Sequence, residues 1–356
     1  MMQKNSYKVV GVMSGTSLDG IDLAEMTFSL NNHQKWEYSF GTTETIPYNP
    51  SWVAVLKEGI HFSAGRLQQL NNDYTLYLAD VISSFIQDHR ITALDAICSH
   101  GHTILHQPQK GITLQIGNLP SIAERLAQTV VCDFRVQDVV LGGQGAPLVP
   151  IGDRLLFSNY DYCLNLGGFA NASNERNGKR FAYDICPVNI VLNSLTEELG
   201  IPYDDGGAIA RNGEANDRLL EQLNALAFYQ LGAPKSLGLE WVQAQIFPLL
   251  NASDISIENK IATFTEHVAY QLSQQFAANS TVLVTGGGAY NTFLLERLGF
   301  YKKLDVTIPD PQLLEFKEAL IFGLLGVLKL RDEVNCLASV TGASRDHSGG
   351  IVYKIA

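Results

Sequence analysis

The order of apolar and polar residues predicts that strands and helices alternate along the chain. Near the amino end, Tyr7–Met13 is an apolar run that ends in a turn rich in glycine, serine and aspartate. The next two segments, Ile21–Phe28 and Trp36–Ile46, alternate apolar with polar residues, as half-buried strands do. Further predicted elements are a helix over Leu67–Ile86, a buried strand over Ala96–Ser99 and a helix over Ser121–Gln128.

A similar unit begins in the middle of the chain. Tyr162–Leu166 is again an apolar run followed by two glycines, and a polar turn is expected over Ser173–Lys179. Phe181–Ile185 returns as a strand, and Asn189–Leu199 is a predicted helix. A second strand, glycine turn and strand favour an internal duplication, although the signal lies in the arrangement and not in repeated sequence.

The rest of the chain continues the alternation. Thr281–Val284 is a β-branched strand that ends in another glycine-rich turn, Thr285–Asn291. A last long helix is expected over Pro311–Leu330, with Asp310 as its N-cap and proline at its first position. Two more helices are expected over Glu214–Leu226 and Ile257–Phe276. Strands that alternate with helices predict an α/β fold.

Composition describes a large, acidic globular protein. The 356 residues suggest two domains or one large one, and 46% of them are hydrophobic, enough for an extensive core. The net charge of −11 argues against binding to nucleic acid or to anionic membranes. The longest apolar run, Ala319–Leu328, is shorter than the roughly 20 residues that span a bilayer. Five scattered cysteines and an amino end without an apolar leader favour reduced thiols in the cytoplasm.

Three glycine-rich turns, each after an apolar strand, are the first candidates for chemistry. They are Gly11–Asp22, Asn165–Asn171 and Thr285–Asn291. Backbone N–H groups can approach an anion closely where there is no Cβ bulk. One such turn is usually only a turn, but three favour a cradle for nucleotide phosphates. The motifs G-x-x-x-x-G-K-[ST] and G-x-G-x-x-G are absent, which weighs against a P-loop NTPase and a dinucleotide-dependent dehydrogenase.

Two carboxylates, Asp19 and Asp22, flank Gly20 at the end of the first turn. A Mg²⁺ ion that bridges phosphates would give them a role, either directly or through water. Caps on local N–H groups are the other interpretation, and both stay open at this point.

Two further carboxylates stand out by position. Asp184 ends a predicted strand just before a helix, where it fits either a general base or a structural cap of that helix. Glu318 lies on the last helix and is expected near its apolar face, where a carboxylate is costly unless it is paired or functional. Its neighbour Glu315 is expected to be solvated.

The segment Ser99–His106 contains three histidines, His100, His102 and His106. They do not match H-E-x-x-H and have no acidic ligand nearby, so polar pocket residues or satisfied histidines are favoured over a zinc site. The irregular turn Gly142–Pro147 is a candidate to line a ligand cleft.

Together these motifs resemble the anhydro-N-acetylmuramic acid kinase family over nearly the whole chain. The segments that carry the resemblance are GVMSGTSLDGID (Gly11–Asp22), SHG (Ser99–Gly101), TLQIG (Thr113–Gly117), DFR (Asp133–Arg135), GGQGAPLVP (Gly142–Pro150), NLGGFAN (Asn165–Asn171), the Asp184 segment, GGGAYN (Gly286–Asn291) and EAL–FG (Glu318–Gly323). The resemblance implies an actin/hexokinase/Hsp70-like, ribonuclease H-like fold of two α/β domains around an ATP cleft. We expect one domain over residues 1–132, a second over 133–335, and a C-terminal segment, 336–356, that packs back on the first.

The resemblance also implies the reaction. With ATP, Mg²⁺ and water, the family converts 1,6-anhydro-N-acetylmuramic acid into N-acetylmuramic acid 6-phosphate and ADP, in peptidoglycan recycling. By the family pattern, Asp184 activates the water that attacks the anomeric carbon, and the freed O6 takes the γ-phosphoryl group. The implied ATP residues are Gly15, Thr16, Ser17, Leu18, Asp19, Gly20, Ile21, Asp22, Asn165, Gly167, Gly168, Gly286, Gly287 and Gly288. The implied sugar residues are Glu318, Asp133, Arg135, Gln144 and His100.

This chain departs from the family pattern at two places. Where the family usually reads Asp-Thr-Gly-Pro-Gly-Asn, Cys186 and Val188 replace the two glycines and add bulk where the backbone could approach sugar or water. His102 stands where the family commonly has glutamine. Two alternatives therefore stay open: a kinase of the same fold that acts on another sugar or acid, and a non-catalytic nucleotide-binding regulator. The residues do not specify the oligomeric state, for which a homodimer is only the general prior.

Overall fold

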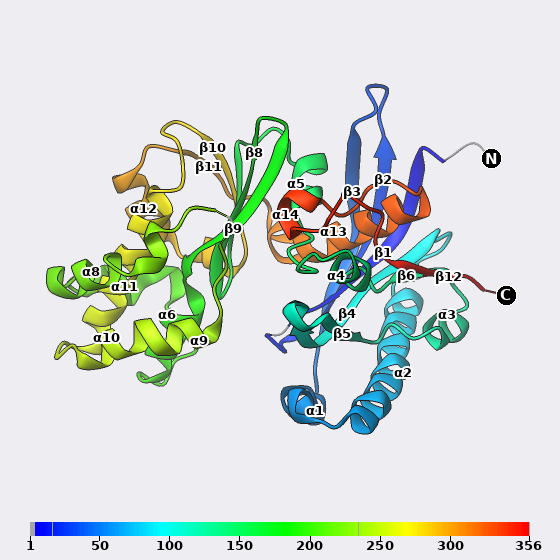
Figure 1. Ribbon diagram of the computed structural model, residues 1–356, viewed down its shortest axis with the longest axis horizontal. Coiled ribbons are helices and arrows are strands. Elements are labelled where there is room, and N and C mark those ends of the chain that lie inside the picture. The colour runs from blue at the N-terminus through cyan, green and yellow to red at the C-terminus, as the bar shows by residue number, and fades with distance from the viewer. Residues whose placement is uncertain (1–3, 16, 234, 356) are drawn as a thin grey trace. The chain divides into compact units, whose positions relative to one another are not determined.

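The computed structural model describes residues 4–15, 17–233 and 235–355, and it divides into two α/β units (Figure 1). Unit 1 comprises Met1–Leu156 and Phe316–Ala356, and unit 2 comprises Phe157–Glu315. The first division falls after residue 156 and not after residue 132, and residues 316–335 lie in unit 1 although we expected them in the second domain. None of the described helices is long and apolar enough to cross a membrane.

The sheet of unit 1 has seven strands among the described residues: β1 (Ser6–Ser14), β2 (Gly20–Leu30), β3 (Trp36–Pro47), β4 (Ala96–Gln107), β5 (Ile112–Ile116), β6 (Val130–Cys132) and β12 (Ile351–Tyr353). Their order is β3-β2-β1-β4-β6-β12, with β5 paired to β4 outside this path. Strands β1, β2 and β3 are antiparallel, whereas β4 runs parallel to β1 and β6 parallel to β4. The C-terminal segment returns to this sheet, because β12 pairs with β6.

The sheet of unit 2 repeats that topology with five described strands: β7 (Tyr162–Leu166), β8 (Phe169–Arg176), β9 (Lys179–Pro187), β10 (Thr281–Thr285) and β11 (Asp305–Thr307). The order β9-β8-β7-β10-β11 matches β3-β2-β1-β4-β6 of unit 1. Its first three strands are antiparallel, and the last two run parallel to β7 and β10. The shared order confirms the predicted duplication and the actin/hexokinase/Hsp70-like fold class.

Helices surround each sheet. Unit 1 has α1 (Pro50–Glu58), α2 (Ala64–Asp88), α3 (Ser121–Leu126), α4 (Val136–Val140), α5 (Pro150–Leu156) and α14 (Ala338–Thr341). Unit 2 has α6 (Asn189–Glu197), α7 (Ala208–Asn212), α8 (Asp217–Asn224), α9 (Leu239–Trp241), α10 (Phe247–Ala252), α11 (Ile257–Ser273) and α12 (Thr292–Tyr301). In α2 the buried residues Leu70, Tyr74 and Leu78 recur every four positions, so one face of the helix joins the core of unit 1.

Helix α13 (Pro311–Leu330) has the bounds that the sequence predicted, and the Asp310 carboxylate accepts a hydrogen bond from the Leu313 N–H at 3.0 Å, as an N-cap does. Most of the helix belongs to unit 1, where it lies directly on the sheet. A Cβ on Gly11 of β1 would stand 2.1 Å from the carbonyl oxygen of Ala319. Glycine therefore permits the close approach that places α13, with Glu318, against β1.

One predicted turn is wrong. Instead of a polar turn over Ser173–Lys179, strand β8 continues to Arg176, and the reversal takes only Asn177 and Gly178, both with positive φ. The polar side chains of β8 point partly into the unit, where the buried Arg180 guanidinium donates to the Ser173 hydroxyl at 2.7 Å. A strand that buries paired polar groups has no apolar alternation for a sequence pattern to detect.

Candidate active site

The first glycine turn connects β1 to β2 and is closed by its own side chains. The Asp19 carboxylate accepts hydrogen bonds from the Ser17 hydroxyl at 2.8 Å and from the Gly20 N–H at 3.0 Å. Leu18 has a φ of 62°, and its N–H points to the Gly15 carbonyl oxygen at 3.4 Å. Asp19 thus caps the turn with one oxygen, while its second oxygen makes no hydrogen bond within the described ranges. The predicted phosphate contact at Thr16 lies outside the described residues.

Asp22 and Ile21 follow on β2 in different environments. Ile21 is fully buried in the core of unit 1, so only its backbone could serve a ligand. Asp22 is half-buried and accepts a hydrogen bond from the Thr45 hydroxyl at 2.6 Å. Asp19 and Asp22 both offer carboxylate oxygens, which are the donors that Mg²⁺ prefers. The donor chemistry at this turn therefore fits a magnesium ion.

A histidine and an arginine form a fixed pair in unit 1. The Arg135 guanidinium donates through Nε to His100 Nε2 at 2.9 Å, and the His100 Nδ1–H donates to the Gly101 carbonyl oxygen at 2.9 Å. His100 is therefore neutral, and burial together with the Arg135 charge holds its pKa well below the ordinary value. Arg135 also donates through Nη1 to the Gly145 carbonyl oxygen at 3.1 Å. Burial lowers the pKa of Arg135 to about 10, against the opposing effect of Glu318, so the guanidinium stays charged.

Glu318 is more accessible than the sequence predicted. It shares an exposed stripe of α13 with Pro311 and Glu315, at positions one and two helical turns apart, and does not lie on the apolar face. Desolvation by the surrounding protein still raises the pKa of Glu318, Arg135 lowers it, and Asp22 raises it. The side chain is exposed, so the carboxylate is available to a ligand.

The other two predicted sugar residues lie on segments around Arg135. Asp133 has a φ of 57° and is half-buried, and burial raises its pKa. Gln144 is exposed at the tip of the Gly142–Pro147 turn, and its backbone N–H donates to the Thr341 carbonyl oxygen at 2.8 Å. The C-terminal segment therefore supports the turn that presents Gln144.

A buried chain of hydrogen bonds, which the sequence analysis did not foresee, starts at the first glycine turn. His102 Nδ1 lies 2.8 Å from the Ser14 hydroxyl, Ser14 lies 2.7 Å from the Tyr48 hydroxyl, and Tyr48 pairs with the Tyr74 hydroxyl. Burial raises the pKa of Tyr48 to about 12 and that of Tyr74 further, so both phenols keep their protons. If Tyr74 donates to Tyr48, every hydroxyl proton in the chain has an acceptor and Ser14 donates to a neutral His102.

His102 predicts a specific acid sensitivity. Burial lowers the pKa of His102 to about 4, so between about pH 6.5 and pH 4 the unfolded chain binds a proton that the folded chain does not. Its contribution to stability is present at pH 7 and is lost as the pH falls, with about 2 kcal/mol lost at pH 5. We expect His102→Gln, whose amide oxygen can accept from Ser14, to lack this loss of stability. Urea unfolding at pH 7 and at pH 5 measures it, as the difference between the two free energies of unfolding. His61→Gln, which replaces an exposed histidine, is the control. An equal change in the free energy of unfolding between pH 7 and pH 5 for wild type and His102→Gln would contradict the prediction.

The two glycine turns of unit 2 meet at the carboxyl ends of the parallel strands β7 and β10, where Thr285 is in register with Asn165. Gly286 has a φ of 84°, and a Cβ there would stand 2.6 Å from Asn165 Oδ1. A Cβ on Gly288 would stand 2.7 Å from the Leu166 Cβ. The turns are therefore in contact, and glycine is required at both positions.

The N-terminus of α6 anchors one of these turns. The N–H groups of Val188 and Asn189 donate to the carbonyl oxygens of Gly168 and Gly167, at 2.8 and 3.3 Å. In the other turn Gly287 is exposed, and a Cβ there would meet no atom within 4 Å. Each turn thus presents exposed backbone, at Gly168 and at Gly287.

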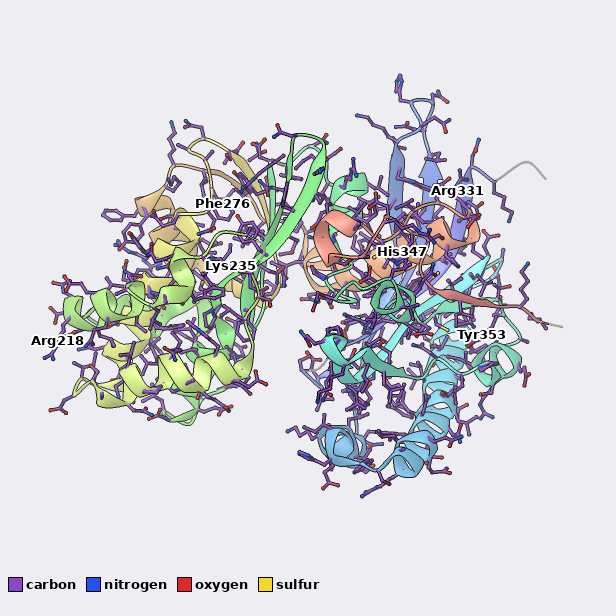
Figure 2. The ribbon with its side chains drawn as sticks, viewed as in Figure 1. Arg218, Lys235, Phe276, Arg331, His347 and Tyr353 are labelled. Atoms are coloured by element: carbon purple, nitrogen blue, oxygen red, sulfur yellow. The ribbon has the colours of Figure 1, made fainter. Side chains whose placement is uncertain are left out.

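Asp184 does not cap α6, which was the structural alternative to a general base, and the general base stays a prediction. Val188 is the N-cap, and in the described structure no side chain caps the helix. The Asp184 carboxylate instead accepts a hydrogen bond from the Leu237 N–H at 2.8 Å, and its own N–H donates to the Lys235 carbonyl oxygen at 3.0 Å (Figure 2 labels Lys235). Asp184 is half-buried, and burial raises its pKa while the Leu237 hydrogen bond lowers it.

The two residues that replace family glycines point inward. Cys186 and Val188 are both fully buried and belong to the hydrophobic core of unit 2. Their side chains therefore add volume to the core, not to the accessible surface around Asp184. This placement weakens the expectation that they obstruct a sugar.

The structure thus gathers the predicted residues in two groups, one in each unit. The group of unit 1 contains the first turn, the pair His100–Arg135, Asp133, Gln144 and Glu318. The group of unit 2 contains Asp184 and the two glycine turns. The sequence did not indicate that Tyr48 and Tyr74 belong to the hydrogen-bonded chain at Ser14. Tyr48 lies in a loop and Tyr74 on α2, so no short sequence motif contains them together with Ser14.

The chain is similar to known proteins over nearly its whole length. A family model described as Anhydro-N-acetylmuramic acid kinase matches residues 7–355. A protein of that name from Mannheimia succiniciproducens is 33% identical over 99% of this chain and 100% of its own length. Another of that name, from Saccharophagus degradans, is 35% identical over 97% of this chain and 98% of its own.

The chain is also similar, at low TM-scores, to solved structures. The activator of the 2-hydroxyisocaproyl-CoA dehydratase from Clostridium difficile with bound ADPNP has a TM-score of 0.41 and 12% identity, over 91% of this chain and 96% of its own. Component A of the (R)-2-hydroxyglutaryl-CoA dehydratase from Acidaminococcus fermentans has a TM-score of 0.44 and 13% identity, over 91% of this chain and 99% of its own. Both scores are low, so the fold assignment rests on the strand order.

Proposed function

This chain belongs to the anhydro-N-acetylmuramic acid kinase family, and from that premise we propose that it opens and phosphorylates 1,6-anhydro-N-acetylmuramic acid. ATP and water are consumed, and N-acetylmuramic acid 6-phosphate and ADP are formed, in peptidoglycan recycling in the cytoplasm. The observation that carries the proposal is the state of Asp184, a half-buried carboxylate that caps no helix and whose pKa is raised.

Asp184 is proposed as the general base. A water molecule loses a proton to the Asp184 carboxylate as its oxygen bonds to the anomeric carbon, and the bond from that carbon to O6 breaks. O6 then bonds to the γ-phosphorus as the bond to the β-phosphate oxygen breaks, which releases ADP. One oxygen of Asp184 is held by the Leu237 N–H, so the carboxylate is oriented before it accepts the proton.

The glycine turns are proposed to hold ATP. The backbone around Gly15–Asp22 in unit 1 and at Gly167–Gly168 in unit 2 would contact phosphates, and Gly286–Gly288 would contact the adenosine. Asp19 and Asp22 would hold Mg²⁺, which when bound neutralises charge on the phosphates during transfer. The Asp19 oxygen that makes no hydrogen bond in the described structure is the plainest candidate ligand.

Unit 1 is proposed to recognise the sugar. Arg135 is charged and uses Nε and Nη1 on His100 and Gly145, so its remaining N–H groups suit the carboxylate of the substrate's acid side chain. Glu318 is accessible and suits hydroxyl or amide donors. Asp133 and Gln144 are proposed as further contacts around this pair.

Product analysis in ¹⁸O water tests the proposal. We expect one ¹⁸O atom at the anomeric hydroxyl of the 6-phosphorylated product and none in the phosphate, together with one ADP per product. Phosphorylation of an ordinary hexose with no turnover of the anhydro sugar would favour a different sugar kinase. ATP binding by calorimetry without any sugar-dependent ADP release would favour a non-catalytic regulator.

A further inference from the structure

A buried group of three metal-ligating side chains lies in unit 1, apart from the residues assigned to the reaction. Asp138 belongs to α4, whereas Cys336 and His347 belong to the C-terminal segment on either side of α14. Their exposed fractions are 0%, 2% and 5%. Figure 2 labels His347. We call these residues the Asp138 cluster.

The backbone fixes two of the three side chains relative to each other. Cys336 and His347 form an antiparallel bridge, in which the Cys336 N–H donates to the His347 carbonyl oxygen at 3.1 Å and the His347 N–H donates back at 3.2 Å. Residues paired in this way project their side chains to the same side. The thiol and the imidazole are therefore held on one side, toward Asp138.

The ligand atoms converge. Cys336 Sγ, His347 Nε2 and a carboxylate oxygen of Asp138 all lie within 4.8 Å of one another. Cys336 Sγ is 3.0 Å and His347 Nε2 is 3.7 Å from Asp138 Oδ1. These separations allow one ion to contact all three atoms after small side-chain shifts, since Zn²⁺ bonds are about 2.0–2.3 Å long.

The imidazole supplies an independent observation. His347 Nδ1 lies 3.2 Å from the Arg345 carbonyl oxygen, to which it can only donate, while the buried Nε2 has no hydrogen-bond partner among the described residues. The buried Nε2 thus lies 3.7 Å from Asp138 Oδ1 without a hydrogen-bond partner in the described part of the chain, and a buried polar atom without a partner costs free energy. A cation at this point would resolve it.

The outer contacts also match a metal site. A metal-bound histidine typically donates its other ring N–H to a carbonyl or carboxylate, as His347 does to Arg345. The second oxygen of Asp138 accepts from the Gly145 N–H at 2.7 Å, whereas Oδ1 accepts from the Cys336 thiol at 3.0 Å and from the Thr341 hydroxyl at 2.7 Å, so an ion would take the place of the thiol proton at Oδ1. The ligands are thus oriented before any metal arrives.

We propose that the Asp138 cluster binds one Zn²⁺ ion through Cys336 Sγ, His347 Nε2 and Asp138 Oδ1. The Cys336 thiol releases its proton to solvent, and the ion with one thiolate, one carboxylate and a neutral imidazole carries no net charge. A neutral assembly is the form that a buried site tolerates best. A thiolate and an imidazole select zinc over Mg²⁺ or Ca²⁺, which prefer oxygen ligands. The Thr341 hydroxyl donates to Asp138 Oδ1 at 2.7 Å and would help to orient that ligand.

The site would fasten the C-terminal segment to the Gly142–Pro147 turn. Besides the Gly145 contact, the Gln144 N–H donates to the Thr341 carbonyl oxygen at 2.8 Å, and the Ser344 N–H donates to the Leu141 carbonyl oxygen at 3.0 Å. The Gly145 carbonyl oxygen accepts a hydrogen bond from Arg135. By fixing Asp138, which holds the Gly145 N–H, zinc would therefore restrict the motion of the backbone that positions Arg135. The role is structural, and the proposal does not depend on the proposed reaction.

Metal analysis of the full chain tests the site. Protein without an affinity tag is treated with a chelator, dialysed, and titrated with Zn²⁺ or Co²⁺ alone. We expect one equivalent of metal per chain, a thiolate-to-cobalt charge-transfer absorption band, and a higher melting temperature for the zinc form. Cys336→Ser and His347→Gln should each weaken zinc binding by more than about 10-fold, and Cys336→Ser should abolish the absorption band.

Cys163→Ser is the matched control, because it removes a buried thiol that lies in unit 2 and not in the cluster. This variant should keep the cobalt absorption band. Circular dichroism of each variant shows whether it folds. The wild-type titration needs no variant, so a folded wild-type chain that binds no stoichiometric Zn²⁺ or Co²⁺ would overturn the proposal. A cobalt band that survives in folded Cys336→Ser would also overturn it.

Discussion

Replacing Asp184 by asparagine is expected to lower kcat by about 10²–10⁴-fold while ATP still binds. The amide cannot accept the proton that the attacking water must lose, but its oxygen can still accept the Leu237 hydrogen bond. The variant should therefore fold like the wild type and fail only in turnover. Steady-state kinetics with a coupled ADP assay, together with calorimetry for ATP, separate these two effects.

The pH profile gives a second measure of the same role. A general base must be ionised, and burial raises the pKa of Asp184, so wild-type activity should fall as the pH drops through that raised pKa. Asp184→Asn should lose this acid limb. Asp161→Asn, an exposed aspartate in the same unit that accepts from Thr281, is the control and should keep both rate and profile. Near-normal product formation by Asp184→Asn would reject the assigned role.

The sequence predicted much of the fold because its strands are mostly apolar on at least one face. The runs Tyr7–Met13, Tyr162–Leu166 and Thr281–Val284 became β1, β7 and β10, and the long helix α13 had the expected bounds. Strand β8 was missed because it buries polar groups that are paired with a strand neighbour, Arg180. Such pairing depends on contacts that no periodicity records.

The motifs named candidate site residues, whose roles stay predictions, but they did not indicate the environments of those side chains. The motifs named Glu318 and Asp184, yet only the packing shows that Glu318 is accessible and that Asp184 caps no helix. Cys186 and Val188 were expected to add bulk near the substrate, and their burial follows from the direction of their side chains. The Asp138 cluster joins positions some 200 residues apart, so no ligand spacing could have indicated it.

Arg135→Ala is expected to lower kcat/KM for the anhydro sugar by about 30–4,000-fold, which corresponds to the roughly 2–5 kcal/mol that removal of one partner of a desolvated charge pair costs. The loss comes from the substrate's carboxylate, which would remain unpaired in the site. The KM for ATP should change little, because the phosphate turns do not depend on Arg135. Arg125→Ala, which removes an exposed pair with Asp80 in the same unit, is the control.

Arg135→Lys should be little more active than Arg135→Ala. Since lysine keeps the positive charge, such a result would show that the geometry of the guanidinium matters in addition to its charge. The planar guanidinium donates in fixed directions to His100 Nε2 and to the Gly145 carbonyl oxygen while it keeps further N–H groups for a carboxylate, whereas one ammonium group cannot match that geometry. The decisive comparison uses 1,6-anhydro-N-acetylglucosamine, which lacks the acid side chain. Wild type should strongly prefer the acid, and both variants should lose that preference. If Arg135→Ala kept the wild-type preference for the acid, the carboxylate would have to bind elsewhere.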